Sequence, residues 1–282
     1  MATILTLKRR IKTAQNVSKT TRAMQMIASS RLRRAQEKAL ASRPYVEKLN
    51  QIAQGLMKNI DKSETHQYLK KTKEPKKTLV IVVSPDRGLC GSLISNLLSQ
   101  VPQDNNFSFV SIGKKGESNL AWLGKKIIAS FPFGNSIPEQ NVVFPIIKII
   151  DEQFLNGEVD EVKILFTHFT SVFAQTPQFT TLLPVELPKD QEIKNDFILL
   201  EPSAEELLPS LLKHYIEMRL HQILLENYAS EQAARTIAMK NATDNARDLI
   251  EDLQLEYNKS RQEKITNEIL DIGGASIALA YE

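Results

Sequence analysis

Residues 4–40 read ILTLKRRIKTAQNVSKTTRAMQMIASSRLRRAQEKAL, and this stretch decides the fold. Steps of three and four residues along it, continued to residue 60, select a stripe of mostly apolar or small side chains. A period of about 3.5 residues kept over about eight heptads predicts a long helix that supercoils left-handedly around a second helix. Pro44 is the only proline in the stretch, and we expect a bend near Arg43. The members of this stripe, the N-terminal seam, are Ile4, Leu7, Ile11, Ala14, Ser18, Thr21, Gln25, Ala28, Leu32, Ala35, Ala39, Ser42, Val46, Leu49, Ala53, Leu56 and Ile60.

A second stripe of the same period lies near the other end of the chain. Ser203 and Glu206 have the spacing of a capping box, and Pro209 follows within the first turns. Neither glycine nor proline occurs between Pro209 and Gly273. Each stripe must be buried, so we expect the two helices to pair as an antiparallel coiled coil. The members of the C-terminal seam are Met218, His221, Leu225, Tyr228, Gln232, Arg235, Met239, Ala242, Ala246, Leu249 and Leu253.

The charges of the two ends are complementary. Residues 1–60 carry roughly a dozen lysines and arginines against only Glu37 and Glu47, whereas residues 203–282 carry about 14 acids and about 8 bases. The net charge of +3 conceals this asymmetry. The two ends are therefore expected to attract each other.

The middle of the chain has a different pattern. Residues 61–77 are polar and are interpreted as a solvated linker, and the run TLVIVVS at 78–84 is typical of a buried parallel strand. Strands alternating with helices predict a small doubly wound, Rossmann-like α/β domain over 78–202, inserted between coiled-coil helices at 1–60 and 203–282. The further strands expected are Phe107–Ile112, Val162–Phe169, Phe179–Val185 and Phe197–Leu200, and the helices expected are about 90–100, 115–126 and 138–156.

The turn after the first strand, Ser84 to Gly91, lies where doubly wound folds bind phosphates. Its spacing matches neither nucleotide-binding glycine motif. Cys90 has no arginine at a phosphatase-like spacing, and as the single cysteine it excludes an intramolecular disulfide and a cysteine-rich zinc site. The four histidines are scattered. We expect no catalytic, cofactor-binding or metal-binding residue, and a turn that presents a surface to a partner.

The basic N-terminal helix also raises nucleic acid or anionic lipid as partners. Tyr45 is the only aromatic residue in 1–60, so base stacking has little support, and acidic protein surfaces are favoured. No apolar run reaches the roughly 20 residues that span a bilayer, and no secretory signal is evident, which favours a cytoplasm-facing protein. Met24 lies beside the seam and Met26 opposite it, where a methionine on a coiled coil faces another protein.

Three groups of motifs give a specific resemblance along nearly the whole chain. They are Thr20–Ala28 with Leu32–Gln36, then Asp86–Gly91, and then Ser230–Arg235, Ala238–Ala246 and Tyr257–Gln262. With these motifs the chain is similar to the gamma subunits of F-type ATP synthases. Two departures are Ser92, where a second glycine is usual, and Ile94, where an asparagine is usual.

The resemblance implies a central rotor shaft that turns inside a ring of three alpha and three beta subunits. Its α/β foot would stand on the membrane c-ring beside the epsilon subunit, and rotation would couple proton flow to ATP synthesis. It implies no nucleotide, cofactor, nucleic acid or small-molecule substrate on this chain, which would be a non-catalytic, peripheral subunit. The absence of the cysteine pair of the chloroplast proteins implies a bacterial protein, at the cytoplasmic face of the inner membrane.

The resemblance also implies contact residues. The positions that match contacts with the alpha–beta ring are Met24, Arg235, Arg261, Gln262, Thr266 and Glu268, and the turn near the foot that meets beta comprises Asp86, Arg87, Gly88, Leu89 and Cys90. The apolar tail, 277–282, would lie in the bearing of the ring.

Two other classes of function are weighed against this one. A coiled-coil adaptor would bind DNA or anionic vesicles in a salt-sensitive way. An α/β enzyme with a helical dimerisation arm would bind a nucleotide or substrate without any partner. The rotor instead requires alpha and beta subunits before any activity appears.

Overall fold

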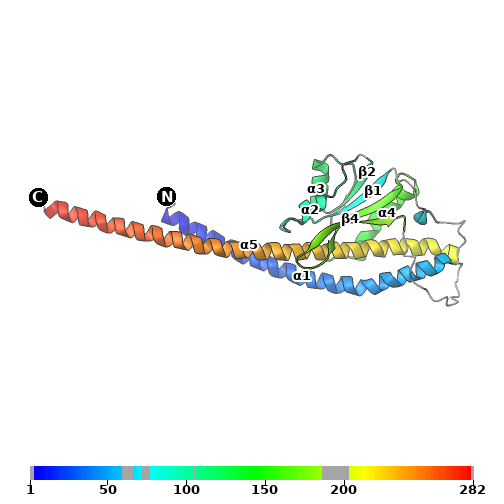
Figure 1. Ribbon diagram of the computed structural model, residues 1–282, viewed down its shortest axis with the longest axis horizontal. Helices are drawn as coiled ribbons and strands as arrows, with labels where there is room; N and C mark the ends of the chain where they lie inside the picture. Colours follow the sequence, from blue (N-terminus) through cyan, green and yellow to red (C-terminus); the bar gives the residue numbers. More distant parts are fainter. Residues whose placement is uncertain (1–2, 59–65, 71–76, 105, 186–202, 281–282) are drawn as a thin grey trace. The chain divides into compact units, whose positions relative to one another are not determined.

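A computed structural model describes residues 3–58, 66–70, 77–104, 106–185 and 203–280 (Figure 1). The chain forms two compact units, one of Met1–Ile27 with Thr236–Glu282 and the other of Ala28–Arg235. Two long helices, α1 (Ile4–Lys58) and α5 (Ala204–Ala280), contribute to both units. The domain boundaries expected from the sequence divide the chain differently from these units and stay a prediction.

Within each unit α1 and α5 lie side by side and antiparallel (Figure 1). In the first unit the hydroxyls of Thr21 and Thr243 are 2.7 Å apart. In the second unit Ser42 bonds Gln222, and further along α1 the hydroxyl of Tyr45 lies 2.7 Å from Nε2 of His214. Later residues of α1 thus meet earlier residues of α5, as the paired seams predicted.

The N-terminal seam is confirmed at every member whose side chain the structure describes, because each is buried or half-buried. The C-terminal seam is confirmed with one correction. Leu249 is 51% exposed, and Ile250 is half-buried instead. The buried or half-buried positions are therefore Ala246, Ile250 and Leu253, with a step of four residues followed by a step of three. The sequence predicted a step of three followed by a step of four. The left-handed supercoil and the bend near Arg43 stay predictions, although α1 remains helical through Pro44.

The start of α5 matches the capping pattern in the sequence. The backbone N–H of Glu206 donates to the hydroxyl of Ser203 over 3.4 Å, which satisfies one of the free donors at the helix start. The helix continues through Pro209, which lies in its second turn.

The α/β domain is a five-stranded sheet in the order β3-β2-β1-β4-β5. Its first four strands in this order are parallel and β5 is antiparallel to β4, so the sheet is mixed. β3 was not expected from the sequence, and the expected strand Phe197–Leu200 lies outside the described residues. The strands are β1 (Thr78–Val83), β2 (Phe107–Ile112), β3 (Ile127–Phe131), β4 (Glu161–Phe169) and β5 (Gln175–Leu183).

Both faces of the sheet are covered, as a doubly wound fold requires. Helices α2 (Leu93–Leu98) and α3 (Lys114–Trp122) bury Leu97 and Leu120 on the face formed by Val80 and Val82. Helix α4 (Val143–Leu155), α5 and the second half of α1 cover the other face, which includes Ile81. All three short helices are shorter than expected; a 3-10 turn, η2 (Gln140–Val142), precedes α4, and β3 takes up the chain beyond α3.

Part of the expected linker is packed and not solvated. A 3-10 turn, η1 (Gln67–Leu69), buries Tyr68, whose hydroxyl donates to Oδ1 of Asp151 over 2.6 Å. The backbone N–H of Val185 donates to the carbonyl of Tyr68 over 2.7 Å. The interpretation of 61–77 as wholly solvated is therefore wrong at this residue. Among the described helices, none has the length and apolarity needed to cross a membrane.

Candidate functional site

The turn after β1 is held from inside by the carboxylate of Asp86. Oδ1 accepts from the backbone N–H of Lys114 at 2.8 Å and of Phe133 at 3.3 Å, and Oδ2 accepts from that of Gly134 at 2.8 Å. Lys114 is the first residue of α3, so the carboxylate lies at a helix N-terminus, where a bound anion is stabilised. Asp86 thus places a negative charge of the chain itself at the N-terminus of α3.

The carboxyl end of β1 is also packed directly against the start of α3. The hydroxyl of Ser84 accepts from the N–H of Gly116 over 2.7 Å. A Cβ on Gly113, whose φ is +103°, would lie 2.0 Å from the carbonyl oxygen of Ser84. The two glycines therefore serve close packing of the chain on itself.

From the other side, α5 holds the same turn. Nη2 of Arg235 donates to the carbonyls of Arg87 at 3.5 Å and Gly88 at 3.4 Å, and it lies 2.7 Å from Oε1 of Glu231. Burial raises the pKa of Glu231, an effect that the neighbouring guanidinium of Arg235 opposes. The turn is thus held to the long helix by hydrogen bonds from Arg235, whose guanidinium also pairs with Glu231 of the same helix.

Cys90 closes the turn as a packing residue. It is buried against Leu93 and Ala234. Burial raises the pKa of its thiol, so the thiolate that nucleophilic chemistry requires is disfavoured. The role of Cys90 that the structure shows is to join α2 to α5.

Only part of the turn is available to a partner. Asp86 and Cys90 face inward, whereas Arg87 and Leu89 are exposed. Leu89 is 61% exposed and has a φ of +64°, a conformation that costs about 1–3 kcal/mol for a non-glycine residue. The surrounding hydrogen bonds hold an apolar side chain outward in a rigid, strained turn.

The other expected contact residues occupy a different environment. Arg235 belongs to the unit with the sheet and is engaged internally, whereas Met24 and the residues near the end of α5 belong to the other unit. Met24 is 39% exposed. Arg261, Gln262, Thr266 and Glu268 are all exposed, and Glu268 pairs with Lys264 at 3.5 Å.

Large apolar side chains accompany these polar ones at the end of α5. Their exposed fractions range from 48% for Ile265 to 72% for Ile272. No other described segment of the chain covers them. A single helix that carries this much exposed apolar surface is typical of a protein-binding element. The members of this apolar set are Ile265, Ile269, Leu270 and Ile272.

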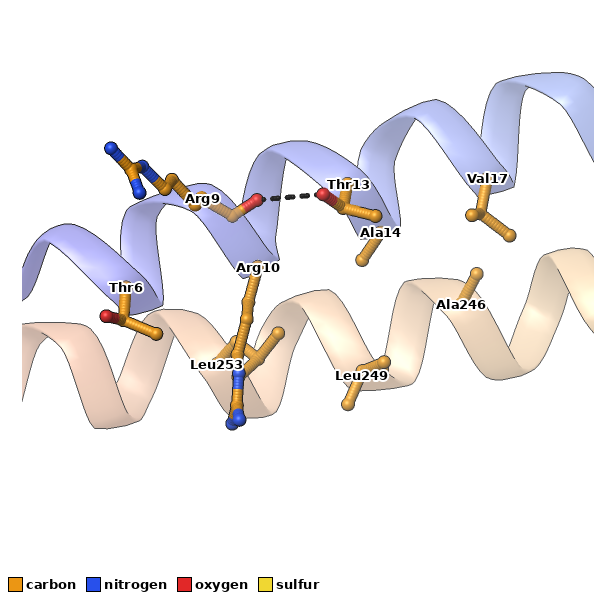
Figure 2. A pocket seen from close by; sticks show the side chains of 9 residues that line it. All are labelled: Thr6, Arg9, Arg10, Thr13, Ala14, Val17, Ala246, Leu249 and Leu253. Atoms are coloured by element: carbon orange, nitrogen blue, oxygen red, sulfur yellow. Dashed lines mark hydrogen bonds between the residues drawn. The ribbon is translucent and has the colours of Figure 1, made fainter. Parts of the chain in front are cut away.

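A groove of about 520 Å³ that was not expected from the sequence lies between α1 and α5 in the unit that contains both chain ends. Figure 2 shows Ala14 of α1 over Leu249 of α5 and Val17 over Ala246, with Arg10 extending past Leu253. The signal in the sequence was one alanine in each seam, Ala14 and Ala246, because small residues leave space that larger ones would fill. The residues that line it are Thr6, Arg9, Arg10, Thr13, Ala14, Val17, Ala246, Leu249 and Leu253.

Comparisons with known proteins agree along the whole chain. A family model described as ATP synthase matches residues 3–279. A protein named ATP synthase gamma chain from Dehalococcoides mccartyi (strain CBDB1) is 40% identical over 99% of this chain and 100% of the relative. The protein of the same name from Legionella pneumophila (strain Paris) is 37% identical over the same shares.

Solved structures share the fold. A chain from the Euglena gracilis mitochondrial ATP synthase, OSCP/F1/c-ring in rotational state 3, is 17% identical with a TM-score of 0.70, over 98% of this chain and 94% of that chain. A chain from the central stalk/c-ring of the Tetrahymena thermophila mitochondrial ATP synthase is 23% identical with a TM-score of 0.59, over 79% of this chain and 99% of that chain.

Proposed function

We propose that this chain, which belongs to the ATP synthase gamma chain family, is the central rotor shaft of an F-type ATP synthase. It turns inside a ring of three alpha and three beta subunits. Its α/β domain stands on the membrane c-ring beside the epsilon subunit. The chain is a non-catalytic, peripheral subunit at the cytoplasmic face of a bacterial inner membrane, and its rotation couples proton flow to ATP synthesis.

The observation that carries the proposal is the exposed apolar end of α5 in a chain of this family. Ile265, Ile269 and Leu270 lie exposed on one long helix, and burying each against a surrounding ring removes about 1.5–3 kcal/mol of unfavourable apolar hydration. The paired helices supply stiffness, since two packed helices resist bending and twisting better than one.

The contacts with the ring follow from the exposed side chains. Met24 of α1 and Arg261, Gln262, Thr266 and Glu268 of α5 are exposed and differ from one another in size and charge. Each beta subunit therefore meets a different surface at a given angle. Rotation changes which surface it meets, and the catalytic subunits change conformation in turn.

The turn after β1 is a second contact. Arg87 and Leu89 point outward, and the hydrogen bonds of Asp86 and Arg235 hold their backbone in place. A rigid contact transmits force with little loss, because its backbone does not yield before the partner moves. Arg235 accordingly acts through this turn as well as at the surface.

The two other classes of function have less support. Membership of the whole chain in this family disfavours a nucleic-acid or membrane adaptor. An enzyme has less support because Asp86, Ser84 and the two glycines in and beside the turn after β1 bond or pack against the chain's own atoms.

Reconstitution tests the proposal. Purified alpha and beta subunits are mixed with and without this chain, and ATP hydrolysis is measured. We expect hydrolysis to rise strongly when the chain is present and to remain low with a chain truncated after residue 235, which lacks the exposed end of α5. Mixtures that are indifferent to the full chain would contradict the proposal.

A further inference from the structure

The sheet is incomplete at the carboxyl end of β4. The parallel register of β1 and β4 ends at Val82 and Leu165, while β4 continues to Phe169. Beyond Leu165, the side of β4 that faced β1 has no strand beside it. Its backbone N–H groups there need other partners, because an unpaired buried N–H is costly.

Helix α5 supplies those partners. The buried carboxamide oxygen of Asn227 accepts from the N–H of Thr167 over 3.0 Å, and Oε1 of Glu226 accepts from the N–H of Phe169 over 3.4 Å. The same carboxylate forms an ion pair with Nδ1 of His168. These five residues form the sheet–helix joint, in which side chains of α5 continue the hydrogen bonding of the sheet.

The joint lies at a particular place in the topology. β1 is flanked by β2 on one side and β4 on the other, so the strand order reverses between β1 and β4. Open α/β sheets bind ligands in the crevice outside this switch point. Here Glu226 and Asn227 of the long helix take the position of a ligand.

Directional bonds matter at this position because a helix can turn about its own axis. Apolar packing resists such a turn through the fit of side chains, and directional bonds add an angular constraint that packing alone does not supply. Hydrogen bonds from strand N–H groups have a narrow angular range, and they fix the angle at which α5 presents each side chain.

Resting on the function proposed above, we infer that Glu226 and Asn227 are positioning residues that fix α5 to the α/β domain against torque. The load from the membrane ring enters through the α/β domain and leaves through the long helices. The sheet–helix joint is where the strand backbone and the helix side chains meet within one unit. Loosening it lets the domain turn without carrying the helix fully with it.

The test compares an unloaded with a loaded assembly. The double variant Glu226→Ala with Asn227→Leu removes both acceptors and keeps an apolar side chain at the buried position. In a soluble assembly with alpha and beta, the α/β domain carries no load, and we expect hydrolysis at the parent level. In the complete membrane complex, we expect protons pumped per ATP hydrolysed to fall by at least about 2–10-fold, the factor in an equilibrium constant that the loss of one of the two hydrogen bonds corresponds to.

Two matched variants separate positioning from folding. Glu226→Gln keeps the acceptor for Phe169, so we expect parental pumping. Gln222→Ala removes the bond of 3.3 Å from Gln222 to the carbonyl of Ala39 on α1 and touches no strand, so we expect it to leave the pumping ratio unchanged. If the double variant does not assemble, the single variant Glu226→Ala, at a half-buried site, carries the test.

Three results would overturn the inference: an equal loss in the soluble and membrane assays, a loss in Gln222→Ala as large as in the double variant, or full pumping by the double variant. Failure of the proposed function is distinguishable, because the unmodified chain would then not raise hydrolysis by alpha and beta at all.

Discussion

Residues 211–235 and 254–272 belong to one helix, α5, and have opposite surroundings. In the first segment every side chain except Lys213 is buried or half-buried. In the second, every described side chain except Tyr257 and Ser260 is exposed. The comparison teaches that an element of uniform secondary structure can serve two purposes: the first segment is anchored by its own domain, and the second is left for other proteins.

Composition explains the difference. Residues 211–235 carry many large apolar side chains, and the sheet, α4 and α1 cover them. Residues 254–272 alternate charged residues with a few aliphatic ones, which a single helix can leave in water at modest cost. The following predictions test how sharp this division is.

The largest effect is expected at Tyr228 in the anchored segment. Its ring packs 6.2 Å from that of Phe133, and its hydroxyl donates to the carbonyl of Asn135 over 3.2 Å. Tyr228→Ala should lower the free energy of unfolding by about 3–5 kcal/mol, measured by urea denaturation. The control, Leu255→Ala at an exposed position, should change it by less than about 0.5 kcal/mol. Similar losses in the free energy of unfolding for both variants would contradict the distinction between the two segments.

Next in size is the effect of a helix breaker between the two segments. Ala246 is buried against α1, and Ala246→Pro should cost about 3 kcal/mol through a lost hydrogen bond and a steric clash. It should also abolish the activation of alpha and beta. Deletion of residues 277–282 removes no described packing and should preserve both thermal stability and activation. An equal loss of activation from both changes would show that stiffness is not what matters.

Arg261 tests the exposed segment alone. Arg261→Ala should leave the unfolding curve of the isolated chain unchanged, because the side chain is exposed. In the assembly with alpha and beta it should reduce ATP hydrolysis about tenfold, the size expected for a lost charged contact at an interface. Arg33→Ala, at an exposed arginine outside the expected contacts, serves as the control. Parental hydrolysis by Arg261→Ala would remove this residue from the contact surface.

The smallest effect is a pH dependence in the anchored segment. Burial raises the pKa of Glu231 above its ordinary 4.5. Its stabilising contribution is therefore complete below the unfolded pKa and is lost as the pH rises through the higher folded pKa. Glu231→Gln should remove this decline, which reaches at most about 1.4 kcal/mol per pH unit. Urea denaturation from pH 4 upward gives the slope of the free energy of unfolding against pH. Identical slopes for parent and variant would contradict a raised pKa of Glu231.

Local pattern was enough to predict the long helices and their seams. A heptad repeat reports directly on the face that a partner helix buries, so every described member of the N-terminal seam was identified. Leu249 was predicted in the C-terminal seam and Ile250 was missed, because a strict repeat does not reveal where two helices adjust their contact. β3 was missed since Ile127–Phe131 is short and follows two lysines at the edge of the sheet.

Other features depend on contacts far apart in the chain. The partners of Asp86 lie 28 to 48 residues away, and those of Glu226 and Asn227 lie on β4. The sheet–helix joint forms because β4 extends beyond the last residue of β1 that pairs with it. This extension is visible only in the strand register. Tyr68 was assigned to a polar linker, although one aromatic ring in such a segment is a reasonable sign of an anchor.

The hydroxyl pair of Thr21 and Thr243 bears on the rotational orientation of the outer surface of α1 and α5. It is a polar contact between α1 and α5 at 2.7 Å, and sliding one helix along the other would separate the two hydroxyls. A helix turns by about 100° per residue, so even a slip of one residue would point the outer face in another direction. The two threonines thus fix the register of the helix pair and, with it, the direction in which the outer surface faces.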